Sequence, residues 1–329
     1  MPSARQLRIA LGRLPGVVVG RWRRGPEQPG WSVAYELLVA TVRAQWNAGG
    51  TLAERRAAMD AAGRDELRRG RATFADATVA GLGAIWTTPR VGHDDAVVLY
   101  LHGGAYVVGS PASHRPITAG LAEAACARVV AVDYRLAPEH ACPAAIDDAV
   151  AAFDALVADG TPPSRIVVAG DSAGGGLTVA TLVALRRRGG PLPAAAVLLS
   201  PWLDLTKTNL DENQPSDYVA RDADNADARS YASALPLDDP RVSPLHADLA
   251  GLPPLYVLAG GAETLRSDSE RLARRADATG VPCTLDIEPG EVHVFPYFDV
   301  VNPRAVAAFR RIGTWVREQL GRAGSVQAA

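Results

Sequence analysis

The chain has 329 residues, of which 48% are hydrophobic and 21% are charged, a balance typical of a soluble globular protein with a sizeable core. Its length permits either two domains or one large α/β unit that carries an insertion. The formal net charge of −2 argues against a nucleic-acid-binding surface over the whole molecule. No apolar run reaches the roughly 18 residues of a transmembrane helix.

The three cysteines predict neither a disulfide framework nor a zinc site, because Cys126, Cys142 and Cys283 are too few and too widely spaced. The first residues lack the pattern of a secretory signal, since Arg13 and Pro15 interrupt the only apolar run. We therefore expect a cytoplasmic protein with reduced thiols and without stable membrane insertion.

The start of the chain is basic. Its arginines have only Glu27 as an acidic neighbour. The arginines concerned are Arg5, Arg8, Arg13, Arg21, Arg23 and Arg24. A solvated basic arm is the favoured interpretation, and contact with an anionic membrane surface or with a partner is the alternative.

Helices are predicted before the first strand. Residues 1 to about 75 lack the alternation of a strand, and helices are expected at 34–46 and 51–70. Thr51 and Glu54, three residues apart, form the pattern of a capping box at the start of the second helix.

Beyond residue 77, strands and helices alternate. Strands are predicted at 77–88, 96–102, 127–135, 165–170, 195–200, 255–260 and 283–288, and helices at 116–127, 144–159, 177–188 and 267–280. Continuous apolar strands between helices indicate an α/β fold with a mostly parallel central sheet that helices cover on both faces. In such sheets, ligands bind outside the carboxyl ends of the strands.

One long segment interrupts this order. Between Leu205 and Pro254 the chain is polar, acidic and broken by Pro215 and Pro236, without a clear strand. A stretch of this length inside a compact domain is either disordered or a functional excursion such as a lid.

A candidate nucleophile lies between the strand at 165–170 and the helix at 177–188. Gly170, Ser172 and Gly174 form the pattern G-x-S-x-G, whose small flanks permit a strained turn that exposes the serine hydroxyl. The pattern alone is weak, because an ordinary strand-to-helix turn capped by a serine has the same letters. Its significance depends on a base, an acid and oxyanion donors elsewhere in the chain.

A base and an acid follow the serine in the order that hydrolases with this turn use. His293 lies in a loop at the carboxyl end of the last strand, whereas the other five histidines lie in turns, in loops or before the serine. Glu263 lies in the turn after the strand at 255–260. Asp268 lies farther on, where a helix is expected. We favour Glu263 as the acid and keep Asp268 as the alternative.

Backbone donors for an oxyanion are expected directly after the strand at 96–102. His102, Gly103, Gly104 and Ala105 form a loop poor in side chains, whose N–H groups can turn toward one point. A further donor is the N–H of Ala173, the residue after the candidate nucleophile. Serine, loop, acid and base, each at the end of a strand, together predict an acyl-transfer site.

The motifs together resemble one family. Its motifs are similar to HGGA at 102–105, DYRLAPEH at 133–140, GDSAGG at 170–175, SPWLDL at 200–205, SPLHADLAGLPPLYVLAGGAE at 243–263 and HVF at 293–295. The family is the hormone-sensitive-lipase-like branch (family IV) of the α/β-hydrolase fold esterases, and the similarity extends from Trp86 to Val316. Ala105 departs from the third glycine of the family's loop, and Glu263 stands where the family usually has aspartate.

The resemblance implies an α/β-hydrolase core with a helical cap. The expected parts are an N-terminal cap segment at 1–75, a first core part at 76–205, a cap insertion at 206–236 and a second core part at 237–329. The family hydrolyses carboxylic esters with short to medium acyl chains, and it needs no metal and no organic cofactor. The expected partner is therefore a small-molecule ester, without nucleic acid, and a homodimer stays open. Arg135 and Glu139 are expected as a buried polar bracket beneath the site.

The sequence assigns roles as follows: Ser172 is the nucleophile, His293 the base, and Glu263 the residue that orients the imidazole. The oxyanion is bound by N–H groups of Gly104, Ala105 and Ala173, in a loop that Gly103 shapes.

Side chains beside these motifs are expected to line the substrate pocket. They are Tyr106, Trp202, Leu203 and Phe295. Two alternatives stay open: a deacetylase or acyl-transfer enzyme with the same triad, and a non-catalytic protein that binds a small ligand in the same fold. The presence of His293 disfavours the second.

Overall fold

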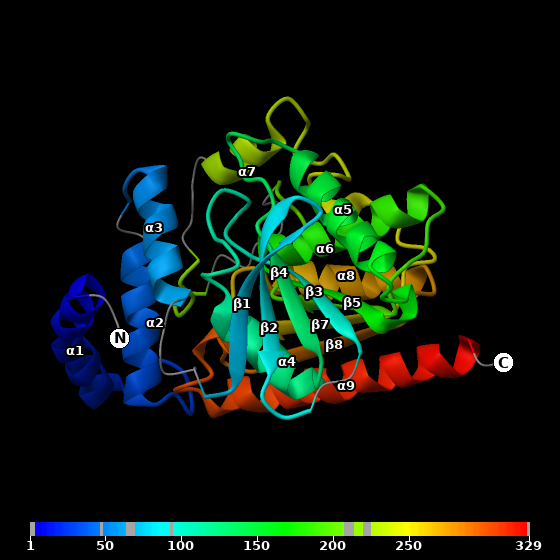
Figure 1. The fold of residues 1–329 in the computed structure, drawn as a ribbon. Helices are drawn as coiled ribbons and strands as arrows, with labels where there is room; N and C mark the ends of the chain where they lie inside the picture. Colours follow the sequence, from blue (N-terminus) through cyan, green and yellow to red (C-terminus); the bar gives the residue numbers. More distant parts are fainter. Residues whose placement is uncertain are drawn as a thin grey trace.

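The computed structural model describes residues 4–46, 49–63, 70–92, 95–206, 214–219 and 225–327. These residues form an eight-stranded sheet with helices on both of its faces (Figure 1). In chain order the strands are β1 (Ala72–Val79), β2 (Leu82–Pro89), β3 (Val97–Leu101), β4 (Arg128–Val132), β5 (Ile166–Asp171), β6 (Ala195–Leu199), β7 (Leu255–Gly260) and β8 (Cys283–Glu288). Across the sheet they follow the order β1-β2-β4-β3-β5-β6-β7-β8. This is the α/β-hydrolase architecture expected from the sequence.

The strands from β3 to β8 run parallel, so their carboxyl ends meet at one edge of the sheet. β3 and β5 are direct neighbours, with Leu101 paired to Gly170 at their carboxyl ends. This register places the loop that begins at His102 beside the turn that carries Ser172.

The strand predicted at 77–88 is wrong in one respect, because the chain forms a hairpin there. β1 pairs antiparallel with β2, and Val79 is paired with Leu82. The reversal falls on Ala80 and Gly81, whose φ angles are +52° and +78°. Two residues with positive φ are what a tight hairpin turn requires. The apolar alternation continues through this turn, so it gave no sign of the reversal.

Helices cover both faces of the sheet. In chain order the helices of the described residues are α1 (Ala4–Arg24), α2 (Val33–Trp46), α3 (Leu52–Gly63), α4 (Arg115–Ala125), α5 (Ala144–Ala158), α6 (Ala173–Arg187), α7 (Ala226–Ala232), α8 (Arg266–Ala278) and α9 (Pro303–Gln327). The helices predicted in these regions from the sequence are confirmed, while α1, α7 and α9 were not predicted. In the described part of the chain, no helix combines the length and the hydropathy needed to cross a bilayer.

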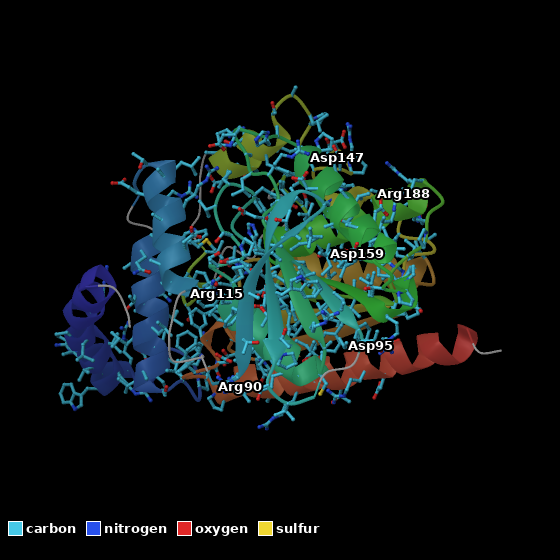
Figure 2. All side chains as sticks on the ribbon, in the orientation of Figure 1. Arg90, Asp95, Arg115, Asp147, Asp159 and Arg188 are labelled. Atoms are coloured by element: carbon cyan, nitrogen blue, oxygen red, sulfur yellow. The ribbon has the colours of Figure 1, made fainter. Side chains whose placement is uncertain are left out.

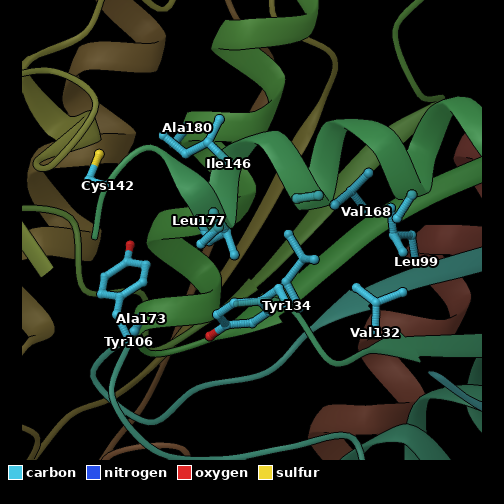
Figure 3. Packing of buried hydrophobic residues seen from close by; sticks show 14 of the residues in the cluster. Leu99, Tyr106, Val132, Tyr134, Cys142, Ile146, Val168, Ala173, Leu177 and Ala180 are labelled. Carbon is cyan, nitrogen blue, oxygen red and sulfur yellow. The ribbon is translucent and has the colours of Figure 1, made fainter. Parts of the chain in front are cut away.

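The central strands are buried because both faces are covered. All residues of β3 and β5 are buried, and successive side chains point to opposite faces. Leu99 and Val168 pack with Leu177 of α6 and Ile146 of α5 (Figure 3). Tyr100, on the other face, belongs to the cluster that α4 and α9 complete. This two-sided core fixes the strand ends that carry the site.

The N-terminal helices α1, α2 and α3 lie at the β1 side of the sheet, and α1 packs against α2 (Figure 1). The capping box of α3 forms as predicted, since Thr51 N–H donates to Glu54 Oε2 at 2.9 Å and Glu54 N–H donates to Thr51 Oγ at 3.3 Å. The helix ends at Gly63, and residues 64–69 of its predicted range lie outside the described residues. A Cβ at Gly63 would lie 2.2 Å from the Ala112 carbonyl oxygen, so this glycine allows α3 to end against the core.

Candidate active site

Ser172 occupies a strained turn between β5 and α6. Its φ of 51° and ψ of −120° are a backbone conformation that non-glycine residues rarely adopt. A Cβ at Gly170 would lie 2.3 Å from the Gly174 carbonyl oxygen, and a Cβ at Gly174 would lie 2.0 Å from that of Leu101. Both flanking positions therefore require glycine, which is the physical content of the G-x-S-x-G pattern. The turn leaves the serine half-buried at the carboxyl edge of the sheet.

His293 lies in the loop that follows β8, at the same edge of the sheet. The imidazole is buried, and its edge packs on Tyr218 with ring centroids 5.9 Å apart. Burial lowers the pKa of His293, and the nearby Asp217 carboxylate opposes that shift. Its backbone N–H donates to Asp217 Oδ1 at 3.1 Å. Within the described residues, Nδ1 of the imidazole has no hydrogen-bond partner.

Glu263 lies in the turn after β7 and is fully buried. Its Oε2 accepts hydrogen bonds from Ser200 Oγ at 2.5 Å and from Gly260 N–H at 2.9 Å. Its Oε1 has no partner among the described residues. Burial raises the pKa of Glu263 to about 8. A buried carboxylate oxygen and a buried imidazole nitrogen, both without a partner, are complementary, and a buried polar atom costs free energy until it is paired.

Two bridges connect the turn of Glu263 to the loop of His293. Ser200 Oγ donates to Glu263 and accepts from Val294 N–H at 2.9 Å. Asp217 accepts from His293 N–H through Oδ1 and from Thr264 N–H through Oδ2, the latter at 2.8 Å. The two loops are therefore held together next to the residues that would act as base and acid.

Asp268, the alternative acid, makes a different set of contacts. It lies in α8, and its Oδ2 accepts hydrogen bonds from Leu203 N–H at 2.8 Å and Asp204 N–H at 2.9 Å. Its Oδ1 lies 3.6 Å from the Arg271 guanidinium. Burial raises its pKa to about 7. The carboxylate holds the loop after β6, which supports Glu263 as the acid.

The loop after β3 presents unpaired backbone donors. Gly103 N–H donates to Asp171 Oδ1 at 2.9 Å, so this group is already in use. Gly104 and Ala105 have φ angles of +119° and +54°. Within the described residues, no acceptor binds the N–H groups of Gly104, Ala105 or Ala173. The structure thus brings three unused donors to the end of β3 and the start of α6, as an oxyanion site requires.

Three buried polar side chains support this loop, and the sequence did not single them out for that role. Asp171 also accepts a hydrogen bond from the Tyr100 hydroxyl, and its Oδ2 lies 3.3 Å from His114 Nε2. Burial alone would raise the pKa of Asp171, but His114, Tyr100 and the Gly103 N–H lower it. His114 precedes α4 in a loop, where nothing in the local pattern marks it as buried. The network holds the carboxylate that fixes Gly103.

His102 is a structural histidine rather than a base. It is fully buried and stacks on Tyr134, with ring centroids 4.2 Å apart. Its Nδ1 lies 2.8 Å from the Gly103 carbonyl oxygen. Burial lowers its pKa to about 3, so the imidazole is neutral and can donate from Nδ1.

The four expected pocket residues have different surroundings. Tyr106 stacks on Tyr231 of α7, with ring centroids 3.7 Å apart, and its ring centroid is 6.4 Å from that of Trp202. Trp202 Nε1 is buried without a partner in the described part of the chain. Leu203 and Phe295 are completely buried in the hydrophobic core. Their contact with substrate stays a prediction for all four.

The bracket expected from Arg135 and Glu139 is not buried. The side chain of Arg135 is 43% exposed and binds Asp148 of α5, with an N–O distance of 2.7 Å. The side chain of Glu139 is 51% exposed and binds Arg56 of α3 at 2.8 Å. Each residue therefore pairs with its own partner at the surface. Arg56 also donates to the Val107 carbonyl oxygen at 2.9 Å, which attaches α3 to the segment behind the oxyanion loop.

Helix α2 and the residue Trp31 before it support the histidine loop. Tyr35 donates through its hydroxyl to Glu291 Oε2 at 2.7 Å, and Trp31 Nε1 donates to the Gly290 carbonyl oxygen at 3.0 Å. Both acceptors lie within three residues of His293. Among the described residues, no cluster of three histidine, cysteine or carboxylate side chains could hold a metal ion.

Comparison with known proteins places the chain in a family. A family model for the alpha/beta hydrolase fold matches residues 98–297. The chain belongs to this family. An acetyl-hydrolase from Streptomyces hygroscopicus is 43% identical to this hydrolase over 253 residues, which are 74% of this chain and 82% of that protein. A carboxylesterase from Mycobacterium tuberculosis is 37% identical over 238 residues, which are 69% of this chain and 75% of that protein.

Comparison with solved structures shows to which branch of the family the chain belongs. An esterase from the bacterial hormone-sensitive lipase family superposes on this hydrolase with a TM-score of 0.80 and 40% identity, covering 86% of this chain and 97% of that one. The esterase EstE5, in a crystal soaked with p-nitrophenyl butyrate, superposes with a TM-score of 0.81 and 36% identity over the same shares. The resemblance to the hormone-sensitive-lipase-like branch is confirmed.

Proposed function

We propose that this hydrolase is a serine carboxylesterase, which cleaves small carboxylic esters through an acyl-enzyme intermediate. The observation that carries the proposal is the strained turn of Ser172 beside three unused N–H donors. The family and its esterase relatives supply independent support. The relatives give no support for the deacetylase alternative beyond that for an esterase.

In the proposed reaction, Ser172 Oγ attacks the carbonyl carbon of the ester while His293 takes its proton. The carbonyl oxygen becomes an oxyanion, which the N–H groups of Gly104, Ala105 and Ala173 stabilise. His293 then gives the proton to the departing alcohol. A water molecule, deprotonated by His293, attacks the acyl-enzyme, and the acid leaves as Ser172 regains its proton.

Glu263 acts through His293 in this scheme. An ionised carboxylate at Oε1 accepts a hydrogen bond from Nδ1 of the imidazole and stabilises the imidazolium that forms when the serine loses its proton. Both atoms lack another partner. A shift of the Glu263 turn or of the His293 loop that brings Oε1 and Nδ1 within hydrogen-bond distance would give each atom a partner. Catalytic hydrogen bonds often tighten only when substrate binds.

We also propose that the segments at 1–75 and 206–236 form the cap over the acyl pocket. The contacts of Tyr231 with Tyr106, of Arg56 with Val107 and of Asp217 with His293 support this proposal, because each one connects a cap segment to a loop of the site.

The location and the oligomeric state are further proposals. Cys126, Cys142 and Cys283 are free thiols, which supports a reducing compartment such as the cytoplasm. A homodimer stays a prediction from the sequence.

The direct test is hydrolysis of a p-nitrophenyl ester by a Ser172→Ala variant. Because a triad acts as a unit, kcat should fall by about 10⁴-fold or more. Ser233→Ala is a matched control, since Ser233 has nearly the same backbone conformation, with φ of 52° and ψ of −113°. Wild-type hydrolysis by a folded Ser172→Ala variant would refute the assignment. Esters from C2 to C12 on the wild-type enzyme then define the acyl length.

A further inference from the structure

Helix α1 presents apolar side chains to solvent. Trp22 is 86% exposed, the most exposed large hydrophobic residue of the described chain. Leu14, Val18 and Val19 are exposed as well. Leu14, Val18 and Trp22 are spaced by four residues, so they follow one another along one side of the helix for about 12 Å. These four residues are the apolar strip of α1.

The same helix carries a concentrated positive charge. Residues 1–24 contain six arginines and no acidic residue, whereas the whole chain has a net charge of −2, which leaves −8 on the remainder. Among the side chains described in α1, from residue 12 to residue 24, only Arg21 forms an ion pair, with Glu36 at 3.0 Å. Arg13, Arg23 and Arg24 thus keep their charge available on the surface.

Nothing in the described chain covers the apolar strip. α1 is the outermost element at its end of the molecule, and it lies against α2 (Figure 1). Its half-buried residues, Val17, Gly20 and Arg21, lie on the side toward α2. In the side-chain view, some side chains of this helix extend to the outside of the molecule and others toward α2 (Figure 2).

We infer that α1 is a peripheral anchor, which lies flat on an anionic lipid bilayer with its apolar strip among the acyl chains near the headgroups. An exposed apolar strip flanked by arginines is the pattern of an interfacial helix, and an indole side chain is favoured at the boundary between headgroups and acyl chains. Each arginine near a negatively charged leaflet adds attraction. The helix lies on the membrane without crossing it, and the enzyme domain stays in water.

A second copy of this chain fits the strip less well than a lipid surface does. A symmetric contact of α1 with its copy would bring together two helices that each carry arginines and no acidic residue, so like charges would approach one another. An anionic bilayer instead offers an apolar layer beneath a negative surface, which complements both features of the helix.

The test uses the full chain and sedimentation with lipid vesicles. One set of vesicles contains phosphatidylcholine alone, and the other contains phosphatidylcholine with phosphatidylglycerol. We expect binding to the anionic vesicles to be at least about tenfold tighter and to weaken as salt is raised. The double variant Val18→Ser/Trp22→Ala should bind at least about tenfold more weakly. The double variant Arg23→Gln/Arg24→Gln should lose about 10- to 25-fold on anionic vesicles only.

A matched control separates this effect from general surface hydrophobicity. Val91 is 85% exposed and lies outside α1, so Val91→Ser should bind vesicles as the wild type does. Circular dichroism should be unchanged in all variants, because the substituted side chains are exposed. Equal binding to both kinds of vesicle, or none to either, would overturn the inference. A dimer that light scattering detects and that Trp22→Ala abolishes would assign the strip to a second copy instead.

Discussion

Replacing Ser200 by alanine removes the hydroxyl that connects the proposed acid to the loop of the proposed base. Ser200 Oγ donates to Glu263 Oε2 at 2.5 Å and accepts from Val294 N–H at 2.9 Å. Ser200 itself has a φ of +47°, which alanine shares without additional strain. The substitution therefore changes the hydrogen bonds and preserves the backbone.

The expected effect follows from the charge that the hydroxyl stabilises. A hydrogen bond to an ionised group contributes about 1.5–3 kcal/mol, which corresponds to about one to two pKa units. Burial already raises the pKa of Glu263 to about 8, and loss of a donor favours the neutral carboxyl and raises it further. Because the scheme needs the carboxylate to stabilise the imidazolium, kcat/KM at pH 7 should fall by about 10- to 100-fold.

The assay is the pH dependence of kcat/KM for p-nitrophenyl butyrate from pH 6 to pH 10, with spontaneous hydrolysis subtracted. The apparent pKa of the rise in kcat/KM should be higher by about one unit or more in Ser200→Ala than in the wild type. The loss of kcat/KM should therefore become smaller as the pH increases. Ser269→Ala is the control, because the Ser269 hydroxyl is buried without a partner among the described residues. A loss that is the same at every pH, or no loss at all, would refute the reasoning.

Four further outcomes are expected. Glu263→Gln should cost about 10³- to 10⁴-fold in kcat while Asp268→Asn costs much less, and the opposite ranking would make Asp268 the acid. Folding raises the pKa of Glu263 from 4.5 to about 8, so the wild-type enzyme loses stability as the pH rises through that window. Because glutamine does not ionise, the Tm of Glu263→Gln should increase relative to the wild-type Tm between pH 5 and pH 8. Asp217→Asn should lower both Tm and kcat, because the amide keeps one acceptor oxygen and the N–H of either His293 or Thr264 therefore loses its acceptor. An unchanged Tm would contradict the bridge. Ala105→Gly should raise kcat/KM for a tertiary-alcohol ester more than twofold relative to p-nitrophenyl butyrate. A smaller change would show that the Ala105 methyl group does not restrict the pocket.

The sequence predicted which loops form the site, because the ends of buried strands can be identified from the sequence. Buried strands are continuous apolar runs, and small residues directly after them mark close backbone approaches. Gly104 and Gly174 illustrate the point, since a Cβ at either position would lie within 2.1 Å of a carbonyl oxygen. The locations of Ser172, Glu263 and His293 follow from the same logic.

The supports of the site could not be read in this way. Asp217 comes from a polar segment with no periodic pattern, so nothing local indicates that its carboxylate would bind both the His293 loop and the turn of Glu263. His114 and Ser200 act through contacts between residues far apart in the chain. The expected bracket of Arg135 and Glu139 failed for a related reason, because the partners Asp148 and Arg56 lie on helices whose orientation the sequence does not specify.

The most direct measurement is covalent labelling by diethyl p-nitrophenyl phosphate, which reacts with an activated serine and mimics the acyl-enzyme. Intact-mass analysis should find one diethylphosphoryl group per chain, peptide mapping should place it on Ser172, and hydrolysis of p-nitrophenyl butyrate should decline in proportion to labelling. Ser172→Ala should remain unlabelled. A label on another residue, or full hydrolysis by the fully labelled enzyme, would contradict a mechanism that depends on Ser172.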